Sequence, residues 1–183
     1  MSSSQRSNLH IKPFELLLDQ TTINKRVAEL GSEITRDYTG KNPLIIGVLK
    51  GCFVFMSDLI RQIKLPVEVE FVSASSYVKG SKQEKEIKFV SAVPTPLKDR
   101  HILVVEGIVD SAKTAVKIVK EFTKEEPASV EIVTLIDKPA SHREKIDLKY
   151  KGFTIGNEFL IGYGLDNTQR YRNLPFIGKL VDN

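Results

Sequence analysis

The sequence predicts an α/β protein with a mostly parallel central sheet flanked by helices. Three observations indicate this class: short runs that are apolar throughout, amphipathic segments with helical spacing, and the alternation of the two along the chain. Strands that alternate with helices pair in parallel through right-handed crossovers. Ligands bind beyond the carboxyl ends of such strands, so the residues that follow each strand are the first place to search for a site.

The first half of the chain supplies two helices and two strands. Residues 22–38 place apolar side chains at helical spacing behind a threonine that can cap the helix. Leu44–Leu49 is apolar throughout, as expected of a strand covered on both faces. A helix follows over residues 53–63, and residues 67–75 alternate apolar and acidic side chains with the period of a strand.

The second half begins with a long polar segment and then resumes the alternation. Residues 75–99 are rich in lysine and are closed by two prolines, and a loop that long within a compact domain is either functional or disordered. Ile102–Val105 is a second buried strand, residues 113–122 form an amphipathic helix, and residues 130–136 form a third apolar strand. The apolar segment near Phe159 is expected to be a further strand.

Composition narrows the class of protein. We expect a flexible tail over residues 1–12 and a single domain over residues 13–183, because 183 residues fit one core. The one cysteine, Cys52, excludes an internal disulfide and suits a reducing compartment. No run reaches the ~18 apolar residues of a membrane span, and the charged residues behind the net charge of +4 are dispersed. We therefore expect a soluble, cytoplasmic protein without a membrane partner.

The turn after Ile102–Val105 has the composition of a phosphate site. Glu106 and Asp110 follow the strand, and small residues lead into the helix. With a helix that starts near Ala112, the amide groups of residues 111–114 lack helical acceptors and converge with the positive end of the helix dipole. The alternative is an ordinary turn in which Asp110 or Ser111 only caps the helix, and the spacing is not that of a Walker loop. The expected phosphate contacts are Ser111, Ala112, Lys113 and Thr114.

Four blocks of the sequence resemble, in family order, the motifs of type I phosphoribosyltransferases. VVEGIVDSAKT resembles the phosphoribosyl pyrophosphate motif, and VLKGCFVFMSDLI resembles the pyrophosphate-binding lysine–glycine turn of the 6-oxopurine branch. LIDKP resembles the purine-reading lysine segment, and NEFLIGYGLDNTQRYRNLP resembles the carboxyl-terminal signature of that branch. The blocks lie within residues 15–181.

The resemblance implies the type I phosphoribosyltransferase fold, with a small hood and a flexible lid loop. It also implies purine salvage, in which the 5-phosphoribosyl group moves from phosphoribosyl pyrophosphate to N9 of hypoxanthine or guanine, with xanthine as a further acceptor to test. The products are IMP or GMP and pyrophosphate. Mg²⁺ is the implied cofactor because the anionic donor is bound together with a metal that prefers oxygen ligands. A homodimer or homotetramer is the implied assembly.

The resemblance assigns proton transfer and pyrophosphate binding to four residues. Asp110 is the candidate general base or acid at N7 of the purine, a role that contributes on the order of 10² to 10⁴ in rate. Lys50, Gly51 and Arg172 would bind pyrophosphate, Gly51 by letting the backbone approach and Arg172 through its planar fork. The peptide bond before Lys50 can be cis in the family. Taken singly, Lys50 and Arg172 also fit an ordinary charged surface.

Five residues are assigned to the base and the metal. Phe159 would stack on the purine, the backbone from Leu160 onward would meet the ring edge, and Lys138 would donate to the exocyclic O6. Asp166 also lies in the purine site, and together with Glu106 it would hold the metal. Without the resemblance, Phe159 is a core aromatic residue and Asp166 is an acid of a turn.

The sequence departs from the family motif in the phosphate turn and in the lid. Gly107 stands where a second acid is expected, and losing that acid removes a charge-assisted hydrogen bond of about 1.5 to 3 kcal/mol. Ala112 replaces the usual glycine, which adds only a methyl group if its φ is negative. Ser76 and Tyr77 resemble the conserved pair of the lid, but lysines and glutamates fill the segment after them.

These departures from the family motif leave two alternative hypotheses about the function. A regulator could sense phosphoribosyl pyrophosphate and bind nucleic acid with the same fold, but neither an added recognition domain nor one broad basic face is visible in the sequence. We therefore do not expect nucleic acid as a partner. A catalytically impaired subunit that only stabilises another protein is the second alternative, and an assay of the isolated chain distinguishes it.

Overall fold

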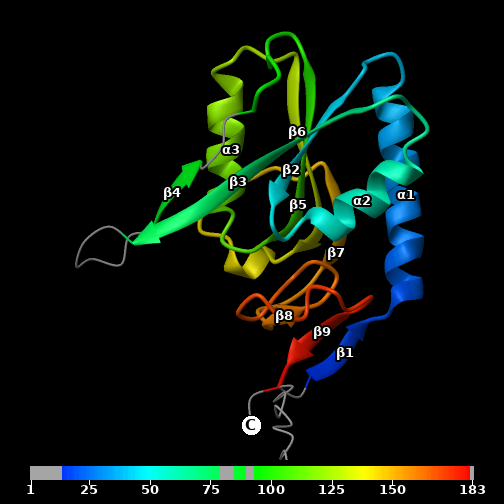
Figure 1. The fold of residues 1–183 in the computed structure, drawn as a ribbon, viewed down its shortest axis with the longest axis vertical. Helices are drawn as coiled ribbons and strands as arrows, with labels where there is room; N and C mark the ends of the chain where they lie inside the picture. The colour runs from blue at the N-terminus through cyan, green and yellow to red at the C-terminus, as the bar shows by residue number, and fades with distance from the viewer. Residues whose placement is uncertain (1–13, 79–84, 90–92, 182–183) are drawn as a thin grey trace, which may run out of the picture.

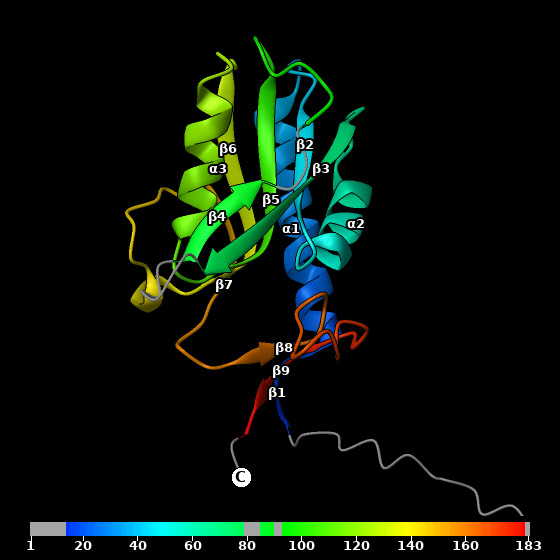
Figure 2. The same cartoon turned by 60° about the vertical axis from the view of Figure 1, so that its left-hand side comes forward.

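The computed structural model describes residues 14–78, 85–89 and 93–181, and only the backbone of residues 74–78 and 85–89. The tail expected over residues 1–12 lies outside the described part. Figures 1 and 2 show a large sheet with helices on both faces and a small second sheet at one end. The predicted α/β class with a mostly parallel central sheet is confirmed.

The large sheet has six strands in the order β4-β3-β2-β5-β6-β7. All neighbouring pairs are parallel except β3 and β4, which are antiparallel at one edge. The carboxyl ends of the five parallel strands therefore all lie on the same side of the sheet, along the line where these strands end. The strands are β2 (Leu44–Leu49), β3 (Glu68–Val78), β4 (Lys85–Phe89), β5 (His101–Val109), β6 (Ser129–Asp137) and β7 (Tyr150–Thr154).

Three helices cover the two faces of the large sheet (Figures 1 and 2). Helices α1 (Gln20–Tyr38) and α2 (Phe53–Gln62) pack against one face, and α3 (Lys113–Thr123) packs against the other. Strand β2 shows why its sequence is apolar throughout: Ile45 belongs to the core under α1 and α2, whereas Leu44 and Ile46 belong to the core under α3. Both faces of the strand are buried, as predicted.

A small three-stranded antiparallel sheet forms the hood that the resemblance implied. Its order is β1-β9-β8, from β1 (Phe14–Leu18), β9 (Ile177–Leu180) and β8 (Leu160–Ile161). Figure 1 shows this sheet beyond the amino-terminal end of α1, so segments from the two ends of the chain lie side by side there. The strand expected near Phe159 is thus only two residues long and belongs to the hood.

Two local predictions were wrong. The side chain of Asp19, not a threonine, caps α1, because its Oδ1 accepts a hydrogen bond from the Thr22 amide at 2.7 Å. The polar segment over residues 75–99 is not entirely loop, because β3 continues to Val78 and pairs with β4. Its lysines hid the period of two in β4, where Ile87 and Phe89 alternate with charged residues.

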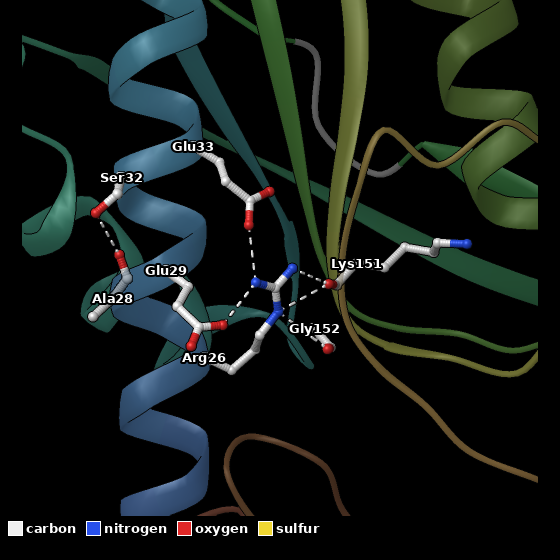
Figure 3. Close-up of polar contacts among 7 residues, drawn as sticks. All are labelled: Arg26, Ala28, Glu29, Ser32, Glu33, Lys151 and Gly152. Carbon is white, nitrogen blue, oxygen red and sulfur yellow. Dashed lines mark hydrogen bonds and ion pairs between the residues drawn. The ribbon is translucent and has the colours of Figure 1, made fainter.

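Arg26 ties α1 to the edge strand β7 (Figure 3). Its Nη2 donates to the Lys151 carbonyl at 2.8 Å, and its Nε lies 3.3 Å from the Lys151 and Gly152 carbonyls. Its Nη1 is 2.9 Å from Glu33 and 3.0 Å from Glu29, so two carboxylates hold the guanidinium in place. The edge strand that precedes the Phe159 segment is thereby fixed to the body of the domain.

Candidate active site

The turn between β5 and α3 carries a row of unpaired amide groups. Within the described part of the chain, the amides of residues 111–114 donate no hydrogen bond, and no side chain caps the helix. Neither Asp110 nor Ser111 therefore plays the capping role that the alternative required. Four free donors beside a helix amino terminus form a site for an anion with several oxygens.

Ala112 shapes this turn in a way that the sequence did not predict. Its φ is +62°, in the left-handed region, and α3 begins only at Lys113. The expectation of a negative φ was wrong. A residue with a Cβ loses about 1 kcal/mol or more in this conformation, which explains why glycine is usual there.

A cavity of about 250 Å³ lies between this turn, the end of β2 and the end of β5. The cavity collects most of the residues that the sequence assigned to the phosphoribosyl group. Lys113 is exposed at the first turn of α3 and does not line it. The predicted residues that do line it are Gly51, Glu106, Asp110, Ser111, Ala112 and Thr114.

Glu106 lines this cavity as a buried acid without a partner. Its side chain makes no hydrogen bond or ion pair with any described residue, and only 9% of the residue is exposed. Burial raises the pKa of its carboxyl from 4.5 to about 8, so the group holds a proton at neutral pH. A buried acid of this kind is stabilised as a carboxylate once a cation reaches it.

Lys138 and Asp110 stand at the ends of neighbouring strands. The register pairs Val109 of β5 with Asp137 of β6, and the Lys138 amide donates to the Val109 carbonyl at 3.0 Å. Lys138 is 5% exposed, and its Nζ lies 3.9 Å from Oδ2 of Asp110, which is exposed. Lys138, the predicted donor to the purine O6, and Asp110, the predicted general acid or base, therefore lie close together.

The side chains predicted to bind pyrophosphate belong to a second polar cluster, which includes one residue that the sequence did not suggest. The Leu49–Lys50 peptide is cis, and Lys50 Nζ lies 3.4 Å from Oε1 of Gln169. The same oxygen lies 3.3 Å from Nη2 of Arg172, which also pairs with Asp166 at 2.7 Å. Gln169 thus joins the two predicted cations, and only its position in the carboxyl-terminal signature could have suggested it.

Phe159 and Leu160 lie apart from the cavity at the turn. Phe159 is 56% exposed and borders a hollow of about 680 Å³ on the hood, whereas Leu160 is buried. The interpretation of Phe159 as a core residue is therefore wrong, and its ring is free to stack. The side chains of Ser76 and Tyr77 lie outside the described part, so their lid role stays a prediction.

Comparison with known proteins decides the family. A family model for the phosphoribosyl transferase domain matches residues 15–168. The chain belongs to the phosphoribosyltransferase family. A crystal structure of a Staphylococcus aureus hypoxanthine phosphoribosyltransferase superposes with a TM-score of 0.89 at 36% identity, covering 97% of each chain. The predicted type I phosphoribosyltransferase fold is confirmed by this likeness.

Curated relatives with similar sequences also bear the name of a hypoxanthine or hypoxanthine-guanine phosphoribosyltransferase, alone or as part of a longer protein. The hypoxanthine-guanine phosphoribosyltransferase of Lactococcus lactis is 43% identical over 166 residues, which are 91% of this chain and 90% of that protein. The bifunctional protein TilS/HprT of Listeria monocytogenes is 39% identical over 173 residues. That match takes in 94% of this chain but spans only 27% of the longer protein.

Proposed function

We propose that this phosphoribosyltransferase moves the 5-phosphoribosyl group from phosphoribosyl pyrophosphate to N9 of hypoxanthine or guanine. The products are IMP or GMP and pyrophosphate. The observation that carries the proposal is the row of four unpaired amides at residues 111–114, next to a cavity that Glu106 and Asp110 line. Its relatives support the same 6-oxopurine chemistry. No feature of the described residues favours a regulatory role.

The chain's own groups account for binding of the donor. The amides of residues 111–114 take the 5′-phosphate, and the hydroxyls of Ser111 and Thr114 add donors. Lys50 and Arg172 take the pyrophosphate, for which Arg172 exchanges its contact with Gln169 for a phosphate oxygen. Two cations on different segments thus meet the leaving group, and their charge stabilises it as it departs.

Asp110 and Lys138 act on the base. Lys138 donates to O6, and Asp110 receives the proton at N7 as N9 attacks the anomeric carbon. The separation of 3.9 Å between Lys138 Nζ and Asp110 Oδ2 leaves the carboxylate held by no short ion pair. Phe159, exposed on the hood, stacks on the purine ring. Because the anomeric carbon passes through a cationic state, orientation and charge neutralisation contribute more than proton transfer.

The residues present fit Mg²⁺ as a cofactor shared with the substrate. Glu106 is a buried acid without a partner, and Asp166 offers a second carboxylate beside Arg172. Among the described residues no cluster of three or more His, Cys, Asp or Glu side chains could enclose an ion. The remaining ligands would come from the donor and water, as Mg²⁺ prefers. When bound, the metal supplies neutralisation of the phosphate charges.

A transfer assay tests the function. With Mg²⁺ and phosphoribosyl pyrophosphate, each of hypoxanthine, guanine and xanthine is offered separately, and nucleotide and pyrophosphate are measured. We expect IMP and GMP, with Asp110→Asn slower by about 10² to 10⁴ in kcat. Asp147→Asn is the matched control, because the Asp147 side chain is exposed and makes no hydrogen bond or ion pair with the described residues. Salt-sensitive nucleic-acid binding without turnover would instead favour the regulator.

We further propose a homodimer or homotetramer in the cytoplasm, with residues 13–183 as one domain. Exposed apolar side chains support assembly: Phe53 on α2 and Val69 and Phe71 on β3 are 44%, 39% and 43% exposed. No helix in the described ranges has the length and apolarity to cross a membrane. Sedimentation equilibrium and a single cooperative unfolding transition test the assembly and the domain.

A further inference from the structure

The carbonyl group of Gly51 is enclosed by two other glycines. A Cβ built on Gly107 would lie 2.5 Å from the Gly51 oxygen and 2.8 Å from its carbonyl carbon. A Cβ built on Gly164 would lie 2.6 Å from the same oxygen, and Gly164 has a φ of +96°. Real Cβ atoms do not approach an oxygen so closely, and the neighbour is backbone, which cannot rotate away. Both positions therefore exclude any side chain while the turn at Gly51 keeps its place.

This contact joins the three segments that supply the proposed donor site. Gly51 follows Lys50, Gly107 lies between Glu106 and Asp110 on β5, and Gly164 precedes Asp166. Gly164 is also bound to Arg172, since Arg172 Nη1 donates to the Gly164 carbonyl at 2.7 Å and the Gly164 amide donates to the Arg172 carbonyl at 2.9 Å. One carbonyl oxygen thus sets the spacing of the pyrophosphate turn from the two other segments.

We propose that Gly107 and Gly164 are positioning residues that hold the Lys50–Gly51 turn for pyrophosphate. This inference rests on the proposed function. It gives the absence of a second acid at residue 107 a structural reason. The Gly51 carbonyl fills the volume that a side chain at residue 107 would need. Gly107 is therefore a requirement of the turn in this chain, and an acid restored there displaces Lys50.

The test compares three variants by steady-state kinetics. Gly107→Ala, Gly107→Asp and Gly164→Ala are expected to raise the KM for phosphoribosyl pyrophosphate about 10- to 100-fold, because a misplacement of about 1 Å carries a cost of that size. The KM for the purine base should change less than threefold, since Lys138 and Phe159 are not moved. A calorimetric titration with magnesium pyrophosphate should show the same loss without any need for turnover.

Two controls separate position from general damage. Gly152→Ala places a Cβ 2.4 Å from the Leu135 carbonyl, a clash like that at Gly107 but on β7. Gly40→Ala shares the left-handed backbone of Gly164, with a φ of +79°, but meets no atom within 4 Å. Both are expected to lower the melting temperature without a selective effect on the pyrophosphate donor. In the double variant Gly107→Ala/Gly164→Ala, the rise in the KM for phosphoribosyl pyrophosphate should be smaller than the product of the two single rises, because both substitutions act on one carbonyl.

Several results overturn the inference. The inference is contradicted if Gly107→Asp binds phosphoribosyl pyrophosphate more tightly than the wild type does. It is also contradicted if Gly107→Ala and Gly164→Ala fold and keep the wild-type KM for phosphoribosyl pyrophosphate. In both cases the proposed function stands. Loss of folding in both glycine variants, with both controls folded, assigns the contact to stability alone and also overturns it. A wild-type protein that binds magnesium pyrophosphate but forms no nucleotide ends the proposed function, and the binding losses still decide the inference.

Discussion

Replacing Glu106 by glutamine should remove a stability penalty that grows with pH. The folded-state pKa of Glu106 is about 8, against about 4.5 when the carboxyl is in water, so between these values the folded protein keeps a proton that the unfolded chain releases. The free energy of unfolding therefore falls as pH rises through this window and levels off above it. At about 1.36 kcal/mol per pH unit, the full penalty is at most about 5 kcal/mol.

Urea unfolding of the metal-free protein at pH 5 to 9 measures this penalty. Glutamine keeps the shape of the side chain but cannot ionise, so the stability of Glu106→Gln minus that of wild type should grow by about 2 kcal/mol or more from pH 5 to pH 8. Any constant cost of the buried amide shifts the whole curve without changing its slope. Glu144→Gln, an exposed acid, is the control. Parallel curves for Glu106→Gln and wild type would refute the assignment of a buried, unpartnered acid.

Three other substitutions address the turn, the base and the second polar cluster. Ala112→Val should lower the melting temperature by roughly 4 to 8 °C, because a β-branched side chain costs about 2 kcal/mol at a φ of +62°; an unchanged melting curve would contradict this. Lys138→Gln should reduce kcat/KM for hypoxanthine about 10- to 100-fold through loss of a charge-assisted hydrogen bond, with the KM for the donor unchanged. Gln169→Leu should tighten magnesium pyrophosphate binding about two- to fivefold in calorimetry, since a competing acceptor for Lys50 and Arg172 is removed; weaker binding would count against that role.

Periodicity predicted the parallel part of the sheet well because burial decides it. The strand Leu44–Leu49 matches β2 residue for residue, since both faces of this strand are covered by helices. Besides β4, the missed strands are β1, β7 and β9, which lie at an edge of the large sheet or in the hood. Their short sequences, such as YKGFT in β7, lack a clean alternation because tertiary contacts, not local preference, keep them extended.

The site was predictable where a motif carries its own backbone geometry. The amides of residues 111–114 are unpaired as the strand–turn–helix pattern predicted, although the φ of Ala112 was not. The link through Gln169 was not predictable, because its oxygen meets Lys50 across 119 residues of sequence. The glycine contacts of Gly51 likewise depend on the packing of three distant segments, which no local pattern encodes.

A crystal structure of the protein with IMP tests the central claim most directly. The account predicts the 5′-phosphate within hydrogen-bonding distance of the amides of residues 111–114, the purine ring against Phe159, and N7 facing Asp110. A phosphate bound elsewhere, with these four amides turned to other acceptors, would contradict it.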